Sequence, residues 1–262
     1  MGVNWLIFLV GGLFSGSLAG LLGIGGGTIL VPLLIAIHHD QTHYQPVNAV
    51  ATSLLAIVIT SISGSIQNWR MGYLDLKRVI YIAIPSLFTA QIGTYLANSV
   101  PDYILLASFA LLLIATIFLT NLRKQLASKT PTDSSKTTNL MVSYVIIGGS
   151  GGLLAGFFGV GGGVVMVPLQ MLLIKENIKT AVQTSLGIIV ITSIAACAGH
   201  ALQGNVQFLE GLLLGIGGLI GAQISTRFLP RLSDQLVTFL FRTLLAILSF
   251  YFLWKAWIAF YS

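Results

Sequence analysis

Long apolar segments, separated by short polar stretches, follow one another along almost the whole chain. A helix needs about 20 apolar residues to cross the hydrocarbon core of a bilayer. Six segments meet that requirement, and we predict transmembrane helices at residues 47–68, 79–98, 103–122, 181–202, 206–228 and 235–260. The pattern therefore indicates an all-α, polytopic membrane protein.

Two further apolar segments, residues 3–37 and 141–174, are each interrupted by three consecutive glycines. A straight helix over the first would be roughly 50 Å long, against a hydrocarbon core of about 30 Å. Glycine has a poor helix propensity, and a helix is expected to break there. The glycines concerned are Gly25, Gly26 and Gly27 in the first segment and Gly161, Gly162 and Gly163 in the second. We predict that each segment is a bent hairpin whose glycine tip lies inside the membrane and which returns to its starting side.

The composition supports this class and excludes others. The chain of 262 residues is 55% hydrophobic and only 8% charged, whereas a soluble domain carries about 25% charged residues. A water-soluble enzyme, a nucleic-acid-binding domain and a disordered chain are therefore excluded. The single cysteine, Cys197, rules out an internal disulfide and a cysteine-based metal site. We expect no cofactor and no metal ion.

The chain contains an internal duplication. Residues 20–27 are echoed by residues 156–163, and both blocks continue into Val-Pro-Leu at an offset of 136. Residues 49–62 match residues 181–194 at an offset of 132, with 11 of 14 positions identical. The order of the blocks recurs as well, since Ala90-Gln-Ile-Gly-Thr94 and Ala222-Gln-Ile-Ser-Thr226 also differ by 132. We therefore divide the chain into a first repeat (1–122), a polar linker rich in Ser and Thr (123–139) and a second repeat (140–262).

The distribution of basic residues predicts the topology. If each repeat is a hairpin plus three crossings, 11 of the 13 Lys and Arg residues fall on one side of the membrane and one on the other. Four plain crossings per repeat would divide them 8 to 4. Cytoplasmic loops carry an excess of Lys and Arg. We therefore predict inverted repeats in the inner (cell) membrane, with both termini outside and the linker in the cytoplasm.

The glycine tips are the first candidate site. Broken backbone at membrane depth is tolerated where it faces protein or a wet cavity, and the arms after the tips begin at Thr28 and Val164. Free N–H groups and the positive end of a helix dipole favour an anion. The upstream glycines, as in Gly16-Ser-Leu-Ala-Gly20, have the spacing that serves close helix packing instead.

Paired hydroxyls and intramembrane amides are further candidates. They are Thr52 with Ser53, Thr184 with Ser185, and the amides Gln91 and Gln223. The Thr-Ser pairs fall near the starts of two predicted helices, where they could cap the helix and offer donors to a ligand, or simply bond the preceding turn. An amide in hydrocarbon commonly forms interhelical hydrogen bonds, and contact with a ligand is the alternative.

Few ionisable residues fall at membrane depth. Arg242 lies within a predicted span, where a charge suggests function, although it could also snorkel beside Arg231. His200 is a candidate proton carrier, with an interfacial histidine at a helix end as the alternative. Glu210 is the one acid placed to share in proton coupling, but it lies near a helix start. The loop residues His38, His39, Asp40 and His43 could suggest a metal site, and a polar loop is the simpler interpretation.

The two Gly-x-x-Gly-x-Gly-Gly-Gly blocks with their Val-Pro-Leu continuations resemble those of the sulfite exporter TauE/SafE family of membrane permeases, as do the Ala-x-x-Thr-Ser blocks. The resemblance covers essentially the whole chain. It implies transport of sulfur-containing anions such as sulfite, sulfonates or thiosulfate, driven by an ion gradient. It also implies that the glycine tips and the Thr-Ser pairs line the site, and it says nothing of Arg242.

Together, the residues and the resemblance predict a secondary transporter that moves a small sulfur-containing anion by alternating access, coupled to protons. An anion channel and a non-transporting membrane scaffold are the alternatives. A membrane enzyme is disfavoured, because no Ser/His/Asp or His-rich pattern lies at membrane depth. The expected partners are the anion and the lipid bilayer, not nucleic acid, and a homodimer is compatible with the sequence.

Overall fold

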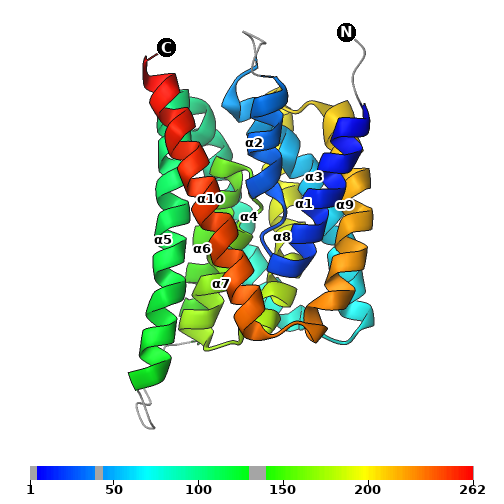
Figure 1. Ribbon diagram of the computed structural model, residues 1–262, viewed down its shortest axis with the longest axis vertical. Coiled ribbons are helices and arrows are strands. Elements are labelled where there is room, and N and C mark those ends of the chain that lie inside the picture. The colour runs from blue at the N-terminus through cyan, green and yellow to red at the C-terminus, as the bar shows by residue number, and fades with distance from the viewer. Residues whose placement is uncertain (1–4, 39–43, 130–139, 262) are drawn as a thin grey trace.

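The computed structural model describes residues 5–38, 44–129 and 140–261, and this part of the chain consists of helices without strands (Figure 1). The helices of the first repeat are α1 (Trp5–Leu22), α2 (Gly27–Ile37), α3 (Pro46–Arg70), α4 (Leu76–Ser99) and α5 (Asp102–Lys129). Those of the second are α6 (Leu140–Phe158), α7 (Gly163–Leu169) with the π-helical turn η1 (Gln170–Ile174), α8 (Ile178–Leu202), α9 (Phe208–Phe228) with the short 3₁₀ turn η2 (Leu229–Arg231), and α10 (Asp234–Tyr261).

Eight helices within the described ranges are long and apolar enough to cross a membrane. They are the six predicted spans together with α1 and α6, the first arms of the two hairpins. The second arms are shorter, since α2 has 11 residues and α7 has seven before its π turn. The all-helical, polytopic fold class is confirmed.

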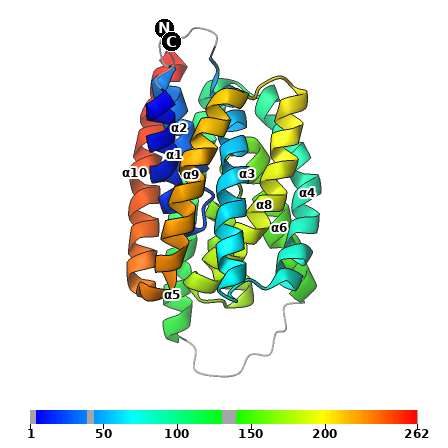
Figure 2. The same ribbon diagram turned by 90° about the vertical axis from the view of Figure 1, so that its right-hand side faces the viewer.

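The helices run in a consistent pattern between the two ends of the bundle (Figures 1 and 2). α1 begins and α10 finishes at one end, which we call the terminal end. α5 finishes and α6 begins at the opposite end, which we call the linker end. α2 turns back from the interior to the terminal end, whereas α7 turns back to the linker end. α5 also continues to Lys129, into the segment that we expected as linker.

The two repeats pack across each other rather than side by side. α1 lies against α9 and α6 against α4, while α3 contacts α8 and α5 contacts α10. Glycines make the first two contacts close: a Cβ at Gly16 would overlap the backbone of Gly218, and one at Gly152 would overlap the backbone of Ser86. The prediction that these upstream glycines serve helix packing is confirmed.

The helices α3 and α8 begin earlier than their Thr-Ser pairs suggested. Gln45 and Asn48 form a capping box at the start of α3, and the Asn177 side chain accepts the Thr180 N–H at the start of α8. Thr52 and Thr184 therefore lie inside their helices, and their predicted capping role is wrong. Polar side chains before the apolar segments of α3 and α8 supply the caps instead.

Candidate functional site

The two glycine tips meet in the interior of the bundle. A Cβ at Gly27 would overlap the carbonyl of Gly159, and one at Gly163 would overlap the carbonyl of Gly23, so each tip touches the turn before the other. Both tips contain a backbone conformation that residues with side chains rarely adopt, since φ is +82° at Gly26 and +81° at Gly162. Glycine adopts this left-handed region without steric cost. The sequence requires glycine here for backbone conformation and for the close approach of the two turns.

Two isoleucines fill the space beside the tips. Ile57 and Ile189 correspond in the duplication, and both are fully buried. A Cβ at Gly25 would lie 3.2 Å from Ile57 and 3.4 Å from Ile189, and one at Gly161 would lie 3.2 and 2.9 Å from them. The two tips thus come together, and apolar side chains pack against them. Anion binding at the tips stays a prediction that requires these isoleucines to move.

Three hydroxyl groups lie close to the tips. Ser15 donates a hydrogen bond to the Gly26 carbonyl at 3.2 Å, and Ser53 donates one to the Gly159 carbonyl at 2.8 Å. Thr28, in the first turn of α2, is fully buried, and its hydroxyl has no hydrogen-bond partner among the described residues. An unpaired buried hydroxyl costs free energy. Thr28 is therefore the predicted residue best suited to meet a ligand at the tips.

The other predicted hydroxyls have different surroundings. Thr52 accepts the Gln207 N–H at 3.0 Å, which ties α3 to the loop before α9. Ser185 accepts a hydrogen bond from the Gln170 amide at 2.7 Å, and Thr184 is buried without a partner in the described ranges. Gln170 was missed by the sequence analysis, although an amide directly after the second Val-Pro-Leu was a usable signal.

The predicted amides bridge helices. The Gln223 amide donates to Gln67 at 2.9 Å and accepts from Ser63 at 3.0 Å, which joins α9 to α3. Gln91 donates to the Ala195 carbonyl at 2.6 Å, which joins α4 to α8. The interhelical interpretation is confirmed for both, and their contact with a ligand stays a prediction.

Arg242 does not join the glycine tips. Its guanidinium donates to the Thr120 hydroxyl at 3.1 Å and to the Thr120 carbonyl at 2.9 Å. These bonds link α10 to α5. Contact of Arg242 with a ligand stays a prediction.

His200 lies in the last turn of α8, in agreement with a histidine at a helix end, and its side chain is fully buried in the bundle. Its Nε2 lies 2.8 Å from the Gly156 carbonyl, which can only accept, so Nε2 donates. Gly156 belongs to the last turn of α6, directly before the second tip. The Nδ1 atom has no partner among the described residues. His200 therefore connects α8 to the base of the second tip.

Each returning arm ends in an ion pair that the sequence analysis missed. His38, after α2, has its Nε2 3.0 Å from the carboxylate oxygens of Glu210 in the first turn of α9. Glu176, after η1, pairs with Arg78 in the first turn of α4. Glu210 and Arg78 correspond at the offset of 132, which was the available signal.

The pair of His38 and Glu210 lies in a partly buried aromatic environment. His38 stacks on Tyr44 with ring centroids 4.1 Å apart. Burial, and secondly the charge of Glu210, raise the pKa of the Tyr44 hydroxyl above its ordinary value. No group of three possible metal ligands occurs in the described ranges. His39, Asp40 and His43 lie outside the described residues.

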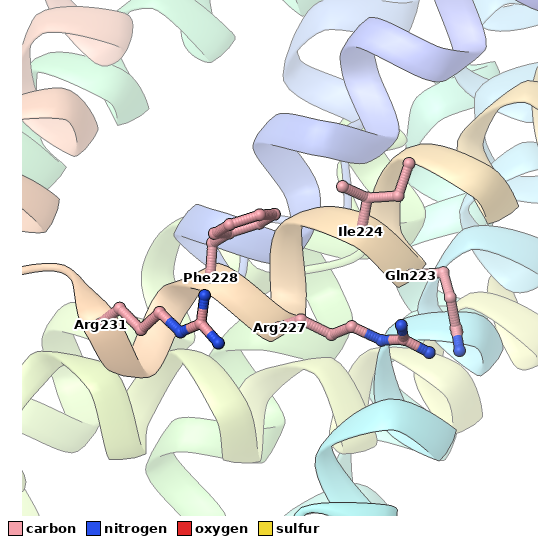
Figure 3. A pocket seen from close by; sticks show the side chains of 5 residues that line it. All are labelled: Gln223, Ile224, Arg227, Phe228 and Arg231. Carbon is pink, nitrogen blue, oxygen red and sulfur yellow. The ribbon is translucent and has the colours of Figure 1, made fainter.

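Surface pockets accompany this interior in the described part of the chain. One, of about 280 Å³, lies at the linker end of α9 and is lined by Gln223, Ile224, Arg227, Phe228 and Arg231 (Figure 3). A second, of about 490 Å³, shares Gln223 and extends along α3 to Arg70. A third, of about 300 Å³, is a polar cleft that contains Lys179, 3.5 Å from Asp234.

The fold and the interior define a polytopic, all-helical membrane protein built around two glycine-broken hairpins that cross at their tips. The family model for the sulfite exporter TauE/SafE matches residues 8–252. A probable membrane transporter protein from Bacillus subtilis, YunE, is 26% identical over 94% of this chain and 96% of its own length. One from Methanocaldococcus jannaschii is 31% identical over 80% of this chain and 76% of its own. The chain belongs to the sulfite exporter TauE/SafE family and is a membrane transporter.

Proposed function

We propose that this transporter moves a small sulfur-containing anion, of the sulfite, sulfonate or thiosulfate class, by alternating access coupled to protons. The name of the sulfite exporter TauE/SafE family supports the substrate class. The crossing of the two glycine tips is the observation that carries the proposal, because it places two breaks in the helical backbone against each other inside the bundle.

The first tip supplies the chemistry for an anion. α2 begins after Gly26 with no side-chain cap, so its first N–H groups lack intrahelical partners and the positive end of its dipole lies at the tip. The unpaired hydroxyl of Thr28 adds a donor. An anion reaches these groups when Ile57 and Ile189 move aside, so the two isoleucines act as the gate of the site.

Alternating access follows from the opposite directions of the hairpins. α2 returns to the terminal end and η1 to the linker end (Figure 1). Movement of one arm would open the site to one side, and movement of the other arm to the opposite side. This arrangement also supports inverted repeats, with the termini outside and the linker end in the cytoplasm. The variant Ser262→Cys, labelled with a thiol reagent applied separately to each side of the membrane, tests the orientation.

Proton coupling is assigned to His200. Because Nε2 is already bonded to Gly156, a proton added at Nδ1 leaves that bond intact and places a charge beside the second tip. An anion at the tips would favour that charge. Binding of anion and proton would then support each other, as coupled transport requires.

The test is counterflow of labelled sulfite, methanesulfonate or thiosulfate in proteoliposomes, with and without a proton gradient. Saturable exchange that responds to the gradient supports the proposal. Unsaturable flux that follows voltage supports a channel, and no flux of any of the three overturns the proposed substrate class. His200→Gln is expected to retain exchange and lose the response to the gradient, whereas Cys197→Ala on the same helix retains both.

A further inference from the structure

A basic pocket lies on the outside of the bundle at the linker end of α9 (Figure 3). Arg227 extends toward Gln223 within it, and the guanidinium of Arg231 lies 5.7 Å from the centre of the Phe228 ring. The neighbouring pocket that shares Gln223 adds Arg70 from the last turn of α3. Three arginines from two helices thus surround one region of the surface.

The charge of these arginines is uncompensated. Arg70, Arg227 and Arg231 form no ion pair with any carboxylate in the described part of the chain, and neither pocket has an acidic residue in its lining. Two other bases at the same end are paired, Arg78 with Glu176 and Lys179 with Asp234. The region is therefore suited to an anion from outside the chain.

The apolar surroundings indicate where that anion comes from. Large apolar side chains are exposed along one face of α9, namely Leu209, Leu212, Ile216, Leu219, Ile220, Ile224 and Phe228. In a bilayer, acyl chains would cover this face. Arg227 and Arg231 follow it at the end of the candidate span Phe208–Arg231, where lipid headgroups would lie. Ile224 and Phe228, about half exposed, form the apolar wall of the pocket itself.

The duplication provides an internal comparison. At the offset of 132, Arg227 corresponds to Tyr95, Arg231 to Ser99 and Arg70 to Leu202. The corresponding face at the terminal end therefore has the same helix pair but none of the three charges, whereas Gln223 keeps its counterpart Gln91. The basic pocket is a property of one end and does not follow from the repeated fold.

We propose that this pocket binds the phosphodiester headgroup of an anionic glycerophospholipid from the leaflet at the linker end. Arg227 and Arg231 hold the phosphate, for which the planar guanidinium is well suited. Arg70 adds charge from the adjoining pocket. The acyl chains lie against Ile224, Phe228 and the exposed face of α9.

The test is a titration of the full chain in neutral detergent with phosphatidylglycerol, in which native mass spectrometry counts the bound lipid. The double variant Arg227→Gln with Arg231→Gln is expected to bind about thirtyfold more weakly, given the usual contribution of each base near an anionic lipid surface. Lys77→Gln is the matched control, since it removes an exposed base at the same end outside both pockets. Its affinity is expected to stay within about twofold.

Two further measurements, on a variant with the charges at the terminal end and on competition by a soluble headgroup, test the proposal. Tyr95→Arg with Ser99→Arg transfers the two charges to the terminal end and is expected to add one tightly bound lipid. Glycerol phosphate, the soluble headgroup, is expected not to displace the lipid at equal concentration, because it lacks acyl chains. Equal affinity of the Arg227/Arg231 variant and the unaltered protein overturns the proposal, as does an equal loss with Lys77→Gln. Full displacement by glycerol phosphate identifies a free-phosphate site and overturns it too.

Discussion

The two hairpins have matching tips but different anchors for their returning arms. The left-handed glycines correspond one to one: φ is 67°, 76° and 82° at Gly23, Gly25 and Gly26, and 69°, 71° and 81° at their counterparts Gly159, Gly161 and Gly162. The arm after the first tip is a regular helix that ends in the His38–Glu210 pair. The arm after the second tip becomes a π turn that ends in the Arg78–Glu176 pair.

This comparison distinguishes the glycines, which both tips need for their backbone conformation, from the residues that anchor the returning arms, which differ between the two hairpins. The turns need glycine at both tips, so the duplication preserved them. The ion pairs reverse their polarity, because the base lies on the arm in the first hairpin and the acid lies on the arm in the second. One arm is therefore held by a histidine and a carboxylate, and the other by an arginine and a carboxylate, which is the stronger hydrogen-bonding combination.

The largest expected effect comes from the tips. Gly162→Ala combines a left-handed φ with overlap between the new Cβ and the Gly151 carbonyl, and we expect a loss of about 3 kcal/mol in the free energy of unfolding together with loss of transport. Gly26→Ala meets the Ser15 side-chain oxygen, which can rotate, and should lose less.

Gly204→Ala is the control for this prediction. Its φ of +76° is equally left-handed, but nothing lies within 4 Å of the added Cβ, so only the conformational cost of about 1 kcal/mol remains. Thermal denaturation in detergent gives the stabilities. An equal loss for Gly162→Ala and Gly204→Ala would show that the packing of the second tip against α6 contributes nothing beyond backbone strain.

Substitutions of Ile57 and Ile189, the proposed gate, test whether the two halves are equivalent. Ile57→Ala and Ile189→Ala are each expected to destabilise the protein by about 3 kcal/mol, because both side chains are fully buried. Each variant should also raise the leak of anion through proteoliposomes. Leu54→Ala, a fully buried change one turn earlier on α3, should match the stability loss without the leak. A leak of the same size in that variant contradicts the gate.

The ion pairs that anchor the two arms are expected to differ in strength. Double-mutant cycles with His38→Gln and Glu210→Gln, and with Arg78→Gln and Glu176→Gln, measure the coupling energy in each pair. We expect about 1–2 kcal/mol for Arg78 with Glu176, since the pair is largely buried. A smaller coupling energy is expected for His38 with Glu210, because His38 meets the carboxylate through one ring nitrogen whereas the arginine guanidinium offers several N–H donors. Equal coupling energies in the two cycles would remove the difference between the arms.

The smallest expected effect concerns the residue after each tip, which is Thr28 in the first hairpin and Val164 at the corresponding position of the second. Thr28→Val removes a buried hydroxyl without a partner in the described ranges and is expected to raise stability by about 1 kcal/mol while weakening anion exchange. Val164→Thr buries a new hydroxyl and should lower stability by a similar amount. Exchange that is unchanged in Thr28→Val, measured by counterflow, argues against ligand contact at the first tip.

The site was only partly predictable. The tips could be identified because glycine runs break helices locally, whatever surrounds them. Ile57 and Ile189 could not be recognised as the side chains that fill the space, because nothing distinguishes them from other apolar residues in their helices. The partner of Arg242 could not be identified either, since Thr120 lies 122 positions away along the chain. The local pattern around an arginine does not say which helix it will face.

The sequence by itself determined the membrane class, the spans, the glycine breaks and the duplication, because hydrophobic runs, helix propensity and repeated blocks are properties of short segments. Only the tertiary structure decided that α1 packs on α9 and α6 on α4, that the tips touch, and that His38 meets Glu210 across 172 positions. Those contacts depend on how helices of similar apolar composition choose partners. That choice rests on small residues, shape and a few polar groups distributed over the whole chain.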